Sequence, residues 1–301
     1  MVIVEDLYDI YGTLIAKKGE RITQHLIKRV KNMPKKNKKR AAMKNTFIYR
    51  DVKKTIHDPR YRIIFDEGHI KKAKILKIAG NTFFEDGIIK ELAYMKKNLP
   101  YTYKHELIVG SLTIKMTLAL KAHRLNSRTA SYGAFTHDIG KNRIAKKVLS
   151  KPTALTVKEY EFIRTHPTIG FLLLVRYEKK KDSRSAITAY QHHERLDGTG
   201  YPNGLRKISI YAQLVAANDI LDALLAKRPY RKESFKLRVA LDYLLEEVEA
   251  KRLNRDAVYA LISFARKDKP EINELKVSLR KRGKSPKGNV YGKLVHAVYH
   301  W

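Results

Sequence analysis

From residue 86 onward, apolar residues recur with the three- and four-residue spacing that places them on one face of an α-helix. Residues 235–248 show the clearest stripe, and residues 103–123 are apolar on most faces, which predicts a central helix. Further helices are expected over residues 86–97, 127–137, 156–166, 183–193 and 208–226, and from residue 254. The pattern therefore predicts a mainly α fold for this part of the chain.

Capping residues and one proline suggest where these helices begin and end. Candidate N-cap residues are Ser127, Thr156, Asp182 or Ser183, and Asn254. Thr156 and Glu159 have the spacing of a capping box, in which side chain and backbone exchange hydrogen bonds. Pro167 is expected to break or kink its helix just after His166, because proline lacks the backbone N–H.

The first 90 residues are patterned differently. Short apolar runs punctuated by Gly12 and Gly19 predict a small strand–turn–strand unit, and residues 23–30 begin a helix. Residues 47–85 give no firm assignment. We therefore expect a small α/β module over residues 1–90, a helical domain over residues 91–266 and a basic tail over residues 267–301.

Composition narrows the chemistry that is available. The 301 residues include no Cys, so any metal ion must be held by His, Asp, Glu or backbone oxygens. A hydrophobic share of 44% is enough to bury a sizeable core. The N-terminus does not resemble a signal peptide, and no apolar run approaches the ~20 residues of a membrane span. We expect a soluble cytoplasmic protein.

The formal net charge of +33 attracts anions such as nucleic acid, acidic lipid headgroups or phosphorylated small molecules. A Lys-rich solvated surface would give the same charge without any ligand. Residues 28–40 hold eight Lys or Arg and no acid, broken by Pro34, which predicts a solvated loop or linker. An anion-binding patch is the second interpretation, and it is disfavoured because no aromatic residue is interleaved to stack on bases.

Two polar clusters interrupt the apolar helices. They are His137-Asp138-Ile139-Gly140-Lys141 and His192-His193-Glu194-Arg195-Leu196-Asp197-Gly198-Thr199-Gly200-Tyr201-Pro202. Adjacent imidazoles are good neutral ligands for a borderline metal ion, and the glycines permit a sharply turning loop. HDxGK followed about 55 residues later by HHExxDGxGYP closely resembles the HD-GYP family, a branch of the HD superfamily of metal-dependent phosphohydrolases. The resemblance covers about residues 100–266 and implies that the helical domain is a helical-bundle HD-GYP catalytic domain.

The resemblance implies two divalent metal ions bridged by Asp138, which would act with Lys141 in catalysis. One ion would be held by His105, His137, Asp138 and Asp219, and the other by Asp138, His166, His192 and His193. Two ions about 3.5–4 Å apart clamp the oxygens of an in-line phosphoryl displacement, and a hydroxide between them would be the nucleophile. The family's metals are often iron and sometimes manganese, and sulfur-free ligation is compatible with both.

The resemblance also implies a substrate. HD-GYP proteins typically cleave cyclic di-GMP to linear pGpG or GMP. Lys141, Arg228 and Arg231 would contact phosphate, and Asp222 would steady Lys141. Tyr201 would either line the cavity against the substrate or anchor its own loop. A signalling partner such as a GGDEF-domain protein is a further expectation.

The chain departs from the family pattern in places. Tyr101 stands where some members carry a Glu that holds a third ion, so we predict two metals. Asn218 stands where a small apolar residue is common, and the connection over residues 204–219 is shorter than usual.

Two other functions stay open. The site could persist in a cyclic-dinucleotide receptor or signalling scaffold that has weak turnover or none. Alternatively, residues 28–40 and the basic tail could bind nucleic acid or an acidic membrane.

Overall fold

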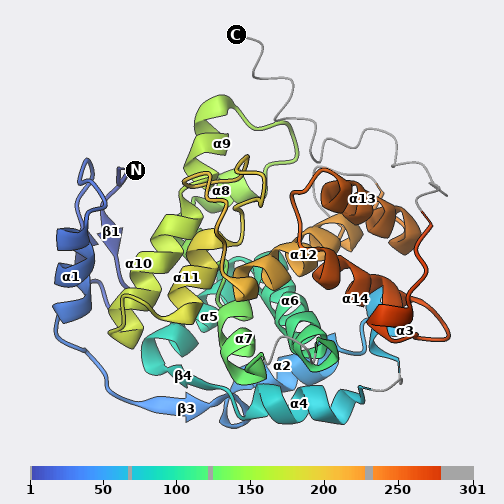
Figure 1. Ribbon diagram of the computed structural model, residues 1–301. Coiled ribbons are helices and arrows are strands. Elements are labelled where there is room, and N and C mark those ends of the chain that lie inside the picture. The colour runs from blue at the N-terminus through green and yellow to red at the C-terminus, as the bar shows by residue number, and fades with distance from the viewer. Residues whose placement is uncertain (1, 67–69, 121–124, 228–232, 279–301) are drawn as a thin grey trace.

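Helix α6 (Pro100–Ala119) runs through the middle of the computed structural model and is the central helix that the apolar pattern predicts (Figure 1). Most of its length is buried because it packs against α5 (Asp86–Asn98), α7 (Ser127–Ala134) and α12 (Ile210–Leu225). It begins at a proline, whose missing N–H has no intrahelical role in a first turn. The structure describes residues 2–66, 70–120, 125–227 and 233–278.

A second group of helices packs beside this centre. It consists of η4 (Ile139–Arg143), α8 (Lys146–Leu149), α9 (Val157–Ile163), α10 (His166–Glu178) and α11 (Arg184–Gln191). The predicted capping box of Thr156 and Glu159 opens α9. The prediction that Pro167 breaks a helix after His166 is wrong, because α10 begins at His166 and places the proline in its first turn. A first-turn N–H has no partner within the helix, so proline starts a helix as readily as it ends one.

The other predicted caps have mixed outcomes. Ser183 caps α11 and Asn254 caps α14 (Arg255–Ala265), each accepting a hydrogen bond from a backbone N–H. The cap of α7 is Asn126, which accepts from two backbone N–H groups, and not Ser127. Helix α7 also ends at Ala134, earlier than expected, because the chain then turns to present the HDIGK motif.

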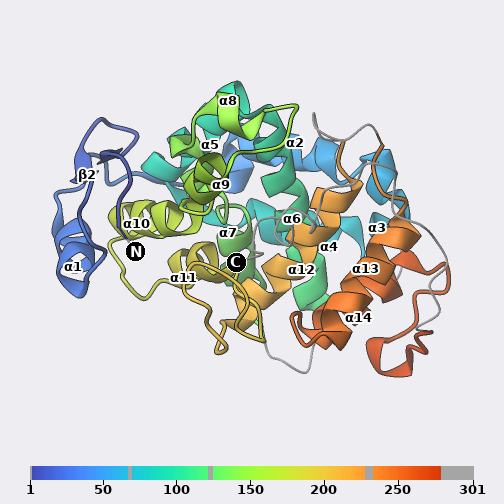
Figure 2. The same cartoon turned by 90° about the horizontal axis from the view of Figure 1, so that it is seen from above.

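Helices α13 (Leu237–Glu249), α14 and the short η5 (Ile272–Glu274) close the end of the molecule opposite the N-terminal hairpin (Figure 2). Helix α13 confirms the apolar stripe over residues 235–248. Of the predicted basic tail, residues 279–301 lie outside the described part of the chain.

The N-terminal segment contains the predicted strand–turn–strand unit. Strands β1 (Leu7–Tyr8) and β2 (Leu14–Ala16) pair antiparallel, and Gly12 takes a φ of +76° in the turn between them. Helix α1 (Gln24–Asn32), capped by Thr23, then packs on α10. Because α1 extends to Asn32, the first residues of the expected basic loop are helical, and the prediction of a loop from residue 28 is wrong there.

The rest of this segment folds onto the helical centre. Strand β3 (Arg40–Ala42) pairs antiparallel with β4 (Phe83–Glu85), which leads directly into α5. Between them lie η1 (Met43–Asn45), α2 (Phe47–Thr55), η2 (Pro59–Tyr61), α3 (Arg62–Phe65) and α4 (Lys72–Gly80).

One continuous hydrophobic core extends from Ile3 in the N-terminal segment to Leu275. The fold is mainly α, with a small N-terminal α/β module, as the sequence predicts. The division of the chain at residues 90 and 266 stays a prediction. Among the described residues, every helix is too short or too polar to cross a lipid bilayer.

Glu178, at the end of α10, should make stability depend on pH. Burial raises its pKa from 4.5 to about 7, although Ser183 and Ser185 both donate hydrogen bonds to its carboxylate. The folded state therefore holds a proton that the unfolded state releases above pH 4.5, so stability should fall as the pH rises towards 7. The expected loss is on the order of 2–3 kcal/mol.

Urea unfolding at several pH values from 4.5 to 8 measures this effect. Glu178→Gln, which is neutral throughout, should remove most of the slope. Glu161→Gln, whose parent side chain is 51% exposed, should keep the wild-type slope. A fall in stability that persists in Glu178→Gln would assign the effect to another group.

Candidate metal centre

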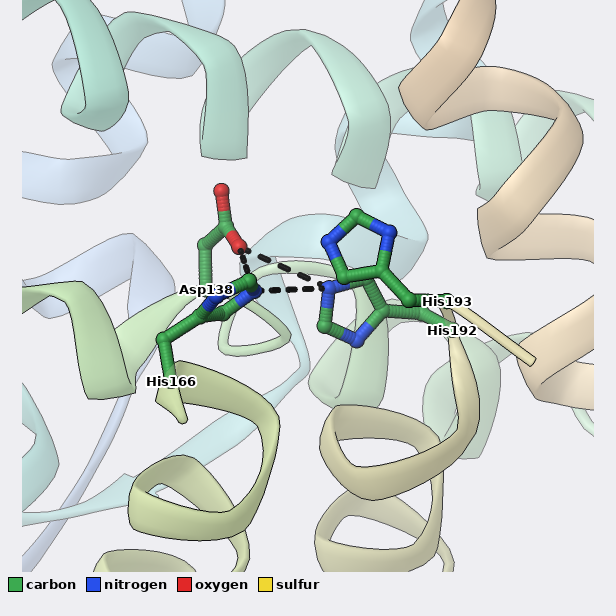
Figure 3. Close-up of side chains that lie close together, drawn as sticks. All are labelled: Asp138, His166, His192 and His193. Carbon is green, nitrogen blue, oxygen red and sulfur yellow. Dashed lines mark hydrogen bonds and ion pairs between the residues drawn. The ribbon is translucent and has the colours of Figure 1, made fainter. Parts of the chain in front are cut away.

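Asp138 directly precedes η4, and its carboxylate faces two pairs of imidazoles. Oδ2 lies 3.8 Å from Nε2 of His105 and 3.8 Å from Nε2 of His137. Oδ1 lies 3.1 Å from Nε2 of His166 and 3.5 Å from Nε2 of His192 (Figure 3). Each carboxylate oxygen therefore faces one pair of imidazoles, which is compatible with the predicted bridging role of Asp138.

The remaining predicted ligands join the same cluster. His193 groups with Asp138, His166 and His192, all offering ligand atoms within 4.8 Å of one another. Asp219 lies on α12, with Oδ1 3.1 Å from Nε2 of His105 and Oδ2 3.9 Å from Nδ1 of His193. The structure thus brings all seven predicted ligands together from α6, the turn before η4, α10, the end of α11, and α12.

Gly140 allows η4 to approach the first turn of α10. A Cβ at this position would lie 2.0 Å from the backbone oxygen of His166, so only glycine fits. The close approach brings Asp138 and His166, from two separate elements, within contact distance of each other. The glycine of the HDIGK motif is therefore required for the packing of η4 on α10, which brings the cluster together.

Three of the imidazoles are oriented through Nδ1 by the backbone carbonyl three residues earlier. The distances are 2.9 Å from His137 to Ala134, 2.7 Å from His166 to Ile163 and 2.8 Å from His192 to Ala189. A proton on Nδ1 that is donated to a carbonyl leaves the lone pair on Nε2, which in each case faces Asp138. The rings of His166 and His192 are therefore preset in the tautomer that binds a metal.

Glu106 supports the cluster and was missed from the sequence. Its side chain is fully buried, with Oε2 2.7 Å from Nδ1 of His137 and Oε1 accepting from the backbone N–H of Asp138 at 2.8 Å. One carboxylate thus contacts both residues of the His-Asp doublet. An acidic residue within an apolar helix, next to His105, was the available signal, because burying a carboxylate is costly unless it is paired.

Asp222 was expected to steady Lys141, and the structure corrects this. Its Oδ2 lies 2.6 Å from Nδ1 of His105, while Lys141 donates to Asp138. Asp222 follows Asp219 by one helical turn on α12, which packs on α6, so its carboxylate meets His105. Lys141 remains next to the cluster, with 20% of its side chain exposed.

Buried atoms without hydrogen-bond partners show that the cluster fits a metal. Within the described residues, Nε2 of His137 is buried and makes no hydrogen bond, and Nε2 of His105 is buried 3.1 Å from a carboxylate oxygen of Asp219. An unsatisfied buried nitrogen costs free energy that metal coordination would recover. Imidazoles and carboxylates without sulfur are the donor set that iron or manganese accepts.

Burial favours the neutral form of three imidazoles, which is the form that binds a metal ion. Burial lowers the pKa of His192 to about 4 and holds the pKa of His166 and His193 below the usual range. These rings are therefore neutral at pH 7, as metal ligands must be.

His137 behaves differently. Burial would lower its pKa, but the carboxylates of Glu106 and Asp138 outweigh burial and raise it to about 10. Without a metal this ring holds a proton at neutral pH, so metal binding should release it.

The loop after His193 is built by its own motif residues. The buried carboxylate of Glu194 accepts from the backbone N–H groups of Asn203 and Leu205, at 2.8 and 2.9 Å. A Cβ at Gly200 would lie 2.3 Å from the backbone nitrogen of Arg195, so glycine is required for the turn. The HHExxDGxGYP motif thus encodes a folded loop as well as ligands.

Tyr201 of this loop packs on the cluster. Its ring stacks on His193 with centroids 4.6 Å apart and an angle of 19°, and the Arg164 guanidinium lies 4.8 Å from its centroid. The contact with His193 makes Tyr201 a loop anchor, and contact with a substrate stays a prediction.

Four further positions were singled out in the sequence. Arg228 and Arg231 lie outside the described residues. Tyr101 is 62% exposed on α6. Asn218 is buried and donates to Thr113 at 2.9 Å, which ties α12 to α6 beside Asp219.

Residues 88–256, more than half of the chain, match the family model of the HD domain. The chain therefore belongs to the HD domain family, and its resemblance to the HD-GYP branch is confirmed by its relatives.

Three of these relatives illustrate the similarity. The chain is 34% identical over 180 residues to a cyclic di-GMP phosphodiesterase of Thermotoga maritima, covering 57% of this chain and 49% of that protein. It is 43% identical over 119 residues to the cyclic di-GMP phosphodiesterase response regulator RpfG of Xanthomonas campestris, covering 39% and 31%. It is 38% identical over 137 residues to the 3'3'-cGAMP-specific phosphodiesterase 3 of Vibrio cholerae, covering 44% and 29%. The chain spans about half or less of the length of these relatives.

Proposed function

We propose that this chain is a cyclic di-GMP phosphodiesterase that holds two divalent metal ions and opens the cyclic dinucleotide to pGpG or GMP. The observation that carries the proposal is the Asp138 carboxylate, whose two oxygens face separate pairs of imidazoles. Cyclic di-GMP is named as the substrate of relatives that are 34% and 43% identical over the matched regions.

The six other proposed ligands would divide around Asp138 into two groups. His105, His137 and Asp219 would hold one ion together with Asp138, and His166, His192 and His193 would hold the other. When bound, the two ions supply Lewis-acid polarisation of the phosphodiester and ionise the attacking water. Iron is the expected metal, and manganese is the alternative.

The protein's own side chains would place the substrate. Lys141 is partly exposed beside Asp138, so its ammonium group can pair with a phosphate oxygen as charge develops. The clustered side chains are imidazoles and carboxylates, which fits hydrolysis by water. A GGDEF-domain partner, which would supply cyclic di-GMP, stays a prediction.

Reconstitution with Fe²⁺ or Mn²⁺ under reducing conditions, followed by a chromatographic product assay, tests the proposal. We expect about two ions per chain and conversion of cyclic di-GMP to pGpG or GMP. The cGAMP-specific relative makes 3'3'-cGAMP the informative competing substrate. Preferential turnover of 3'3'-cGAMP would reassign the substrate, and tight binding of cyclic di-GMP without product would select the receptor function.

A further inference from the structure

The imidazole of His105 is held differently from its neighbours. Backbone carbonyls lie within hydrogen-bond distance of Nδ1 in three other rings of the cluster. In His105, the partner of Nδ1 is the side-chain carboxylate of Asp222, at 2.6 Å. A helical carbonyl is already fixed by the backbone, whereas a carboxylate rotates about its side-chain torsions. The orientation of His105 therefore depends on what holds Asp222.

Tyr61 holds that carboxylate from the other side. Its hydroxyl donates to Oδ1 of Asp222, while Oδ2 faces His105. Tyr61 is fully buried and Asp222 is 1% exposed, so water does not compete for this hydrogen bond. Tyr61 belongs to η2, ahead of residues 88–256 that match the HD domain.

The short η2 segment is itself fastened to α6. Asp58 caps it and accepts hydrogen bonds from the backbone and guanidinium of Arg60, at 2.9–3.1 Å. The ammonium group of Lys104, the residue before His105, lies 2.8 Å from the same carboxylate. Tyr61 is thus placed by contacts with the very turn of α6 that carries His105.

We propose that Tyr61 is a positioning residue of the metal centre, acting on His105 through Asp222. The inference rests on the proposed function in that it takes His105 as a metal ligand. The hydrogen bond keeps Asp222 where it fixes the tautomer and direction of the His105 ring, so that Nε2 points to the ion. Tyr61, which precedes the residues that match the HD domain model, therefore contributes to metal affinity.

Binding of Mn²⁺ to the full-length apoprotein, measured by competition with a chromogenic chelator, tests this role. Tyr61→Phe should lower the affinity for one of the two ions by about 10- to 100-fold. This is the usual effect of removing a residue that hydrogen-bonds to a metal ligand. Tyr132→Phe is the matched control, because its hydroxyl also donates to a carboxylate, that of Glu85. This control should keep the wild-type affinity, and the absorption spectrum of the Co²⁺-loaded protein should change only in Tyr61→Phe.

Asp222→Asn is the second variant. If Tyr61 acts through Asp222, the double variant Tyr61→Phe/Asp222→Asn should bind Mn²⁺ no more weakly than Asp222→Asn alone. Wild-type affinity in Tyr61→Phe, or losses that multiply in the double variant, would overturn the proposal. Unchanged affinity in Asp222→Asn overturns it even where Tyr61→Phe does not fold. A wild-type chain that binds no Mn²⁺ would instead refute the proposed function.

Discussion

Asp138→Asn is expected to lose both high-affinity metal ions and to hydrolyse cyclic di-GMP at least ~10³-fold more slowly than the wild type. The carboxylate is the one group whose oxygens approach both pairs of imidazoles among the described residues, at 3.1–3.8 Å. An amide keeps the shape but removes the negative charge and one of the two oxygens. The variant therefore has no negative charge between the two pairs of imidazoles at this position.

Elemental analysis of the reconstituted variant and the product assay check this expectation together. Asp242→Asn serves as the control, because that carboxylate lies on α13 and pairs with Arg238 at 3.0 Å. The control should retain both metal and turnover. An Asp138→Asn protein that holds two ions would show that Asp138 does not bridge them.

Four of the clustered residues were predictable because their motifs are local, whereas His105, His166 and Asp219 were expected only from the family resemblance. His137 and Asp138 are adjacent, as are His192 and His193, and such doublets identify the family directly. Their orienting carbonyls also lie only three residues away, within the same turn. The mainly α fold was predictable for a similar reason, since helical periodicity is contained in a short window.

The partners that hold the cluster were not predictable, because they lie far apart in the sequence. Tyr61 meets Asp222 across 161 positions, and no local pattern links a tyrosine to a carboxylate at that distance. Strands β3 and β4 were missed for a related reason, because three residues are too few to show alternation. Pro167 was misassigned because its chemistry suits both the end of one helix and the start of another.

Glu91 on α5 is a second buried site whose partners come from distant segments. It is fully buried, and its carboxylate accepts from Arg143 through both oxygens and from Tyr177 at 2.6 Å. Asn142 donates to it as well, at 2.7 Å. Arg143 also donates to the backbone oxygen of Tyr8, which connects the N-terminal hairpin to the segment that carries the HDIGK motif.

Glu91→Ala is expected to lower the free energy of unfolding by about 3–5 kcal/mol, because it leaves the mostly buried guanidinium of Arg143, with 19% of the side chain exposed, without its anion. Urea unfolding measures the loss. The double variant Glu91→Leu/Arg143→Leu should recover much of it, since apolar side chains can replace a buried ion pair. Arg62→Ala, which breaks an exposed pair with Asp66, is the control and should cost less than about 1 kcal/mol. If Glu91→Ala lowers the free energy of unfolding no more than this control does, the Glu91–Arg143 pair does not stabilise the packing of the N-terminal hairpin on η4.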